Sequence, residues 1–160
     1  MSANFEWSET DHAAPGDITD GISNLNFGNA DNPNLSPVSS YPITAGENAY
    51  EKYIRAKFSG IFTKIENMKF WKSAGDYKTG ETIAYRLVVT YVQPVITDMG
   101  GTAIPITEGT AVTIHASDGT TLYIDSAGYT EYFVLQLKTS AATPAGAVNS
   151  KVFKFQYDES

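Results

Sequence analysis

The sequence contains no cysteine and only two histidines among its 160 residues. The lack of cysteine excludes disulfides, thiolate nucleophiles and cysteine-ligated zinc within this chain. Stability must therefore come from a packed core or from assembly with other chains. The length fits one domain with an appendage. We expect no metal and no other cofactor.

Lysine and arginine are missing from residues 1–51, which hold eight of the 18 acidic residues. All eleven basic residues lie from Lys52 onward, so the rest of the chain is close to neutral. Direct nucleic-acid binding needs a basic patch that neutralises phosphate charge, and we therefore expect none. The acidic segment is either a solvated tail or a tether for a basic protein surface.

Long apolar runs are also missing. No stretch approaches the roughly 20 apolar residues that a membrane-spanning helix needs. The residues after Met1 show no basic segment followed by an apolar one, as a signal peptide would. We expect a soluble protein that is made in the cytoplasm and has no membrane partner.

Residues 1–46 are rich in proline, glycine, asparagine, serine and aspartate, and we find no regular apolar period in them. A flexible linker rarely carries phenylalanine, tryptophan and tyrosine in such number. The segment is therefore predicted to be an extended arm that orders only against other protein, whether its own domain or a neighbour. Its predicted partner-binding anchors are Phe5, Trp7, Ile18, Ile22, Leu25, Phe27, Leu35, Val38, Tyr41 and Ile43.

Alternating apolar and polar residues dominate from Glu47 onward, with turn residues every 8–12 positions. The gaps are too short for crossover helices, which favours antiparallel pairing. Asp118-Gly119 is a strong hairpin signal. Residues 47–160 are thus predicted to form an all-β, antiparallel two-sheet sandwich, immunoglobulin-like or jelly-roll-like, with the extended N-terminal arm appended. The expected strands are Lys52–Lys64, Asn67–Lys72, Thr82–Gln93, Ile104–Ile106, Ala111–Ala116, Thr121–Asp125, Thr130–Lys138 and Asn149–Tyr157.

Residues suited to catalysis are few. Ser/His/Asp catalysis needs a histidine held between two partners, but His12 lies in the arm and His115 alternates with apolar residues, so we expect it to face solvent. Asp125 and Glu131 flank a turn and could meet across a hairpin as a carboxylate pair, although surface solvation is the ordinary explanation. Asp17–Gly21 only faintly resembles a calcium loop. We expect a protein that is not an enzyme.

Exposed aromatic side chains offer an alternative function. Trp71 alternates away from Met68 and Phe70, and Tyr77 follows in the next loop. Together they could form a platform for a sugar or receptor, which would make the chain a carbohydrate- or receptor-binding module. Against this, Trp71 could instead pack on the second sheet or under the arm.

Four stretches carry a resemblance to a known class: AGENAYEKYIR at 45–55, MKFWK at 68–72, NLNFG at 24–28 and FKFQYD at 153–158. With them, most of the chain resembles virion structural proteins of tailed bacteriophages. The resemblance implies a small β-sandwich that decorates or cements a capsid, or belongs to a neck or tail. It implies a homo-oligomer that binds the major capsid protein or neck and tail subunits through its arm. Deleting residues 2–46 should then leave a folded sandwich that no longer joins the particle.

Overall fold

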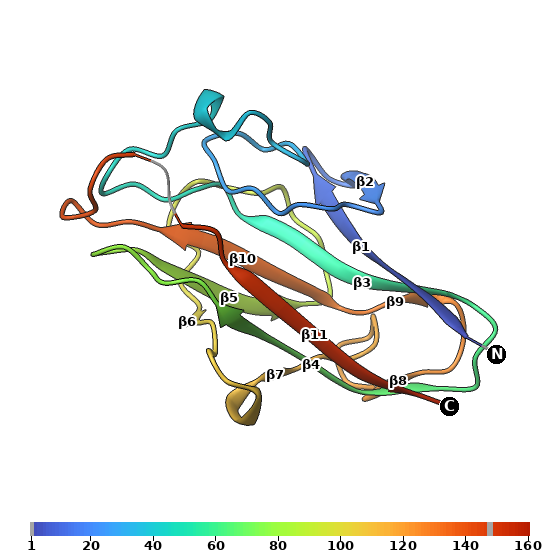
Figure 1. Ribbon diagram of the computed structural model, residues 1–160. Coiled ribbons are helices and arrows are strands. Elements are labelled where there is room, and N and C mark those ends of the chain that lie inside the picture. Colours follow the sequence, from blue (N-terminus) through green and yellow to red (C-terminus); the bar gives the residue numbers. More distant parts are fainter. Residues whose placement is uncertain (1, 147–148) are drawn as a thin grey trace.

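The computed structural model describes residues 2–146 and 149–160. Two antiparallel β-sheets pack against each other around a shared core (Figure 1). The expected all-β architecture with two antiparallel sheets is therefore confirmed. No helix in the described part of the chain is long and apolar enough to cross a membrane.

The larger sheet has seven strands, all paired antiparallel. The central strands β3, β10 and β5 belong to segments that were predicted to be extended, because each alternates between a core face and an outer face. In spatial order the strands are β2 (Asp17–Asp20), β1 (Ala3–Asp11), β3 (Lys52–Gly60), β10 (Tyr132–Lys138), β5 (Thr82–Val88) and β6 (Thr102–Ala103), and β9 (Gly128–Tyr129) also pairs with β3.

The smaller sheet is built around β4 (Ile65–Ala74). Strand β11 (Val152–Glu159) pairs with one edge of β4, while β7 (Val112–Thr113) and β8 (Tyr123–Ile124) also pair with it. The turn at Asp118-Gly119 forms, and the Ala116 N–H donates to the Thr121 carbonyl across it. The strands β7 and β8 farther from the turn pair with β4 and not with each other, so the predicted hairpin does not extend beyond the turn. Two short 3-10 helices, η1 (Val38–Ser40) and η2 (Glu108–Thr110), complete the structure.

Aromatic rings fill the space between the two sheets. Trp7 from β1 meets Phe70 and Phe133 edge-on, at centroid distances of 5.9 and 5.6 Å. Phe5 stacks on Phe155 of β11 at 5.5 Å. Edge-on and offset stacked rings are favourable arrangements for aromatic side chains. These contacts tie β1 to the smaller sheet as well as to its own.

The N-terminal segment differs from the predicted arm. Residues Ala3–Thr10 pair with β3 along its length, and Ser8–Asp11 pair with β2 on the other side. The apolar alternation of Phe5 and Trp7 was missed because Glu9 and Asp11 occupy the next two positions on the same face. Residues 3–20 are therefore part of the larger sheet, and the expected boundary at residue 46 does not separate them from the sandwich.

Candidate functional site

The predicted arm anchors lie mostly within the chain's own core. Ile22 and Leu35 are buried, while Phe5, Trp7, Leu25, Phe27 and Ile43 pack partly buried against the core. Tyr41 is half-buried, and only Ile18 and Val38 are exposed, at 51% and 53%. Side chains that fill their own core are not free to bind a neighbour, so these ten residues do not form a joint docking surface.

The predicted aromatic platform is likewise not formed. Trp71 is only 7% exposed, so its ring is not offered to a ligand. Tyr77 is partly buried against the core, and the ammonium groups of Lys72 and Lys151 lie 4.8 and 5.4 Å from its ring centre. The structure supports the packed position that was considered for Trp71, and the two rings do not form the ligand face that was proposed.

A loop that covers the outer face of the larger sheet has the features of an interaction site. Residues 89–101 connect β5 to β6, and Tyr91 and Met99 pack on Tyr53, Tyr132 and Val134 of the sheet beneath. The sequence had suggested that β5 continues to Gln93, but the strand ends at Val88. The chain then leaves the sheet and crosses over its outer surface.

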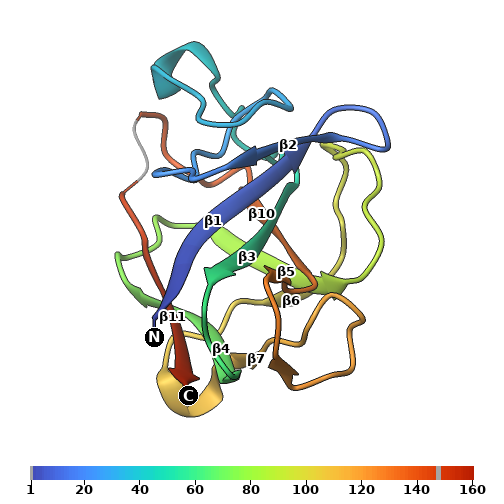
Figure 2. The same cartoon turned by 90° about the vertical axis from the view of Figure 1, so that its right-hand side faces the viewer.

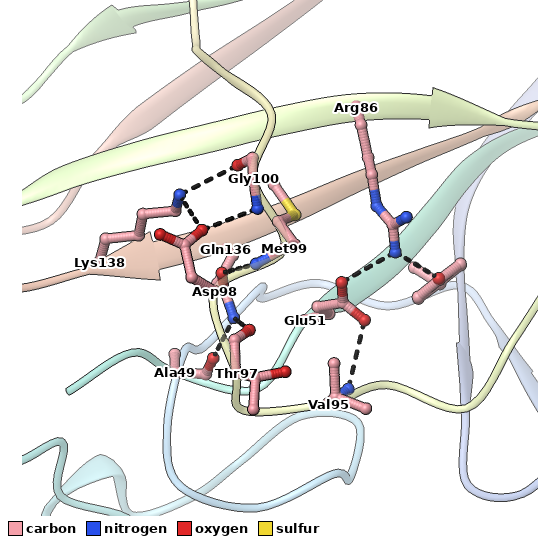
Figure 3. Close-up of polar contacts among 11 residues, drawn as sticks. Ala49, Glu51, Arg86, Val95, Thr97, Asp98, Met99, Gly100, Gln136 and Lys138 are labelled. Atoms are coloured by element: carbon pink, nitrogen blue, oxygen red, sulfur yellow. Dashed lines mark hydrogen bonds and ion pairs between the residues drawn. The ribbon is translucent and has the colours of Figure 1, made fainter.

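Side chains from the sheet hold this loop by its backbone (Figure 3). Gln136 of β10 is fully buried; its Nε2 donates to the carbonyls of Ala49 and Thr97, and its Oε1 accepts from the Met99 N–H. Glu51 accepts from the Val95 N–H at 3.2 Å. Each of these bonds satisfies a polar group that would otherwise be costly to bury.

Charged residues reinforce both ends of the anchored loop. Arg86 Nη2 donates to Glu51 Oε1 at 2.8 Å and to the Tyr53 hydroxyl at 2.9 Å, which fixes the carboxylate that holds Val95. Lys138 Nζ forms an ion pair with Asp98 and donates to the Gly100 carbonyl (Figure 3). The loop from Val95 to Gly100 is thus fastened at several points.

The loop exposes four apolar side chains among several exposed polar ones. Val89, Val92, Val95 and Ile96 are 53%, 50%, 43% and 37% exposed. Single exposed apolar residues are ordinary, but several on one short loop that is held in place are typical of a surface that binds protein. We call these four residues the apolar loop face.

A surface cavity of about 620 Å³ adjoins the apolar loop face, with Val89, Val92, Tyr53, Arg86, His115 and Glu131 among its lining residues. His115, which we expected to face solvent, has a side chain that is 26% exposed at this cavity, and its Nδ1 lies 2.6 Å from Oε1 of the buried Glu131. That oxygen also accepts the His115 backbone N–H. The pair can hold an imidazole in position, which is one part of acid–base chemistry.

The other candidate chemical groups are dispersed. Asp125 is exposed and borders a different surface depression, while Glu131 is engaged by His115, so the suggested carboxylate pair is not formed. In the suggested calcium loop, Asp17 Oδ2 lies 3.2 Å from Nδ1 of His12, whereas Asp20 accepts from Lys57 at 2.8 Å. These two carboxylates therefore serve different partners.

A buried charged cluster at the end of β1 was not predicted. Lys52 Nζ lies 2.7 Å from Glu9 Oε1, with side chains that are 1% and 0% exposed. Asp11 is buried beside them, and burial, with the nearby charge of Glu9, raises its pKa to about 8. The signal available in the sequence was the position of these acids in register with Phe5 and Trp7.

Comparisons with known proteins add no assignment: no protein-family model, no curated protein and no solved structure matches this chain.

Proposed function

We propose that this chain is a non-catalytic virion structural protein of a tailed bacteriophage, which binds neighbouring protein subunits as a decoration or cement protein. The observation that carries the proposal is the apolar loop face, Val89, Val92, Val95 and Ile96, on a loop whose stretch from Val95 to Gly100 is bonded to Glu51, Gln136 and Lys138. A pre-ordered apolar surface loses little conformational entropy when a partner covers it.

The sequence supports the phage assignment through the four stretches that resemble tailed-phage virion proteins. In this proposal the sandwich is of the immunoglobulin-like or jelly-roll-like type, and the chain is located in the virion after synthesis in the host cytoplasm. Its partners are the major capsid protein or neck and tail subunits. The loop replaces the N-terminal segment as the main contact, because most of the predicted arm anchors are occupied by the chain's own core.

The alternative of a sugar- or receptor-binding module has less support. It depended on Trp71 and Tyr77, and the first is buried while the second packs against the core beside two lysines. A glycan array with the wild type and Trp71→Ala separates the two proposals. Binding that is lost in the variant would favour the sugar-binding module.

Incorporation into particles tests the main proposal. Val92→Asp places a carboxylate in the apolar loop face, where a partner would have to bury it unpaired. We expect purified phage particles to contain the wild-type chain and to contain at least about tenfold less of the variant, as the loss of a central interface contact produces. Quantitative mass spectrometry of the particles measures both.

Ile61→Asp is the matched control, because Ile61 is 70% exposed and lies in the connection between β3 and β4, outside residues 89–101. It should enter particles as the wild type does. Absence of the wild-type chain from purified particles would overturn the virion proposal, and equal incorporation of Val92→Asp would remove the loop from it.

A further inference from the structure

Strand β11 forms a long free edge of the smaller sheet. It is eight residues long and pairs with β4 on one side, and among the described residues no strand pairs with its other side. The other outer strands, β2 and β6 of the larger sheet and β7 and β8 of the smaller one, have four residues or fewer. Proteins usually keep edge strands short or interrupt them, because an open edge can pair with another chain.

Strand β11 is continuous from Val152 to Glu159, but its register with β4 shifts between Val152 and Phe153 and between Gln156 and Asp158. At both shifts the additional residue belongs to β4, so the alternation along β11 itself is kept. Ser160, directly after β11, exchanges backbone N–H and C=O bonds with Lys64, and the Val152 carbonyl accepts from the side-chain hydroxyl of Ser73 in β4. Even-numbered residues of β11 therefore direct their backbone groups at β4. Since these directions alternate along a strand, the N–H and C=O groups of Phe153, Phe155, Tyr157 and Glu159 point to the free edge.

The side chains along the edge also alternate. Phe153, Phe155 and Tyr157 pack partly buried against the core, whereas Val152, Lys154, Gln156 and Asp158 are exposed on the outer face. Phe155 and Tyr157 lie beside Phe5 of β1, at ring distances of 5.5 and 5.9 Å. Figure 2 shows β1 and β11 next to each other on this side of the sandwich, with the two chain ends close together.

One antiparallel register of β11 with a second copy of itself matches opposite charges. In an antiparallel pair, side chains of directly opposite residues lie on the same side of the sheet. The two-fold axis that relates the two copies must therefore pass midway between one residue and the same residue of the second copy. With the axis at Gln156, Lys154 of each copy faces Asp158 of the other, and Phe155 faces Tyr157. An axis at Phe155 or Tyr157 instead places Lys154 opposite Gln156 or Ser160.

We propose that two copies of this chain associate through antiparallel pairing of β11, with the two-fold axis at Gln156. The outward backbone groups of Phe155 and Tyr157 then bond to those of the second copy, and the smaller sheets become one continuous sheet. Lys154 makes no ion pair within residues 2–146 and 149–160, so its charge is available for Asp158 of the second copy. This association is separate from the apolar loop face.

Charge reversal on the full-length chain tests both the dimer and its register. Sedimentation equilibrium should show a wild-type dimer. Lys154→Asp and Asp158→Lys should each weaken it by about tenfold or more, because each turns two facing attractions into repulsions. The combined variant Lys154→Asp/Asp158→Lys restores opposite charges and should recover the dimer.

Two controls keep the outcomes separate. Asp76→Lys makes the same charge change as Asp158→Lys at an exposed position outside β11, and Val92→Asp alters the apolar loop face; both should leave the dimer intact. Hydrogen exchange of residues 152–159 should slow as protein concentration rises. A monomeric wild type, a combined variant that stays dissociated, or a dimer that Val92→Asp disrupts would each overturn the proposal.

Discussion

Asp11 is held in a protonation state that its sequence position does not suggest. Burial beside Glu9 disfavours the charged carboxylate and raises the pKa to about 8, although Lys52 opposes the shift. An aspartate in an unfolded chain titrates near pH 4. The folded protein therefore binds a proton here, between about pH 4 and pH 8, that the unfolded chain has released.

The sign of the pH effect follows from this proton. Folding stability from Asp11 is fully present below pH 4 and falls as pH rises through 8, because the folded form binds the extra proton. Asp11→Asn removes the titration but keeps the shape. Relative to wild type its unfolding free energy should rise by about 1–4 kcal/mol between pH 5 and pH 8, the upper end corresponding to the three pH units of this range at about 1.4 kcal/mol each.

Urea unfolding of both proteins at several pH values measures this difference. Asp125→Asn, at an exposed carboxylate away from the cluster, is the control and should track the wild type. A constant difference between Asp11→Asn and wild type across this pH range would show that Asp11 is ionised in the folded protein.

Strand β1 is joined to the rest of the sandwich in three ways: its backbone pairs with β3, its Phe5 and Trp7 rings enter the core, and its Glu9 neutralises the buried Lys52.

The structure therefore changes the expected result of deleting N-terminal residues. Removing residues 2–11 should abolish cooperative unfolding, since an unpaired buried charge alone costs about 3–5 kcal/mol. Circular dichroism during thermal unfolding measures this. A sharp transition in the truncated chain would show that the sandwich folds without β1.

The anchored loop depends most on one side chain, Gln136, which bonds to three backbone groups. Gln136→Met keeps the volume but leaves those groups unpaired, which should lower the unfolding free energy by about 1–3 kcal/mol. Hydrogen exchange should accelerate at the Met99 amide while β10 and β3 remain protected. Gln93→Met, at an exposed position of the same loop, should change neither quantity. Unchanged exchange at Met99 in Gln136→Met would show that the other contacts suffice.

The sheets as a whole were predictable wherever a strand has one consistently apolar face. Strand β3 shows Ile54, Ala56 and Phe58 on its inner face, and β11 shows Phe153, Phe155 and Tyr157. Strand β1 was not predicted because acidic residues follow Phe5 and Trp7 on its inner face, and Lys52, which pairs with Glu9, lies far away in the sequence. Strands β7 and β8 are too short for a pattern, and only the position of β4 selects their pairing.

The candidate site was less predictable than the fold for a related reason. The apolar residues between Val89 and Ile96 read as the continuation of a strand, and nothing local indicates that they leave the sheet. The course of the loop from Val95 to Gly100 depends on Glu51, Gln136 and Lys138, which come from three other places in the chain. Long-range polar contacts of this kind leave no periodic signal in a single sequence.

Glu51, Gln136 and Lys138 bond mainly to the backbone of the loop, and Asp98 contributes a side chain that forms an ion pair with Lys138. The backbone groups are Val95 N–H, Thr97 C=O, Met99 N–H and Gly100 C=O. Substitutions at Val89, Val92 or Ile96 can therefore alter the outward chemistry while the supporting bonds persist. Substitutions in the loop can therefore change which partner protein is preferred at little cost to folding, as in scaffolds where a constant framework carries variable binding loops.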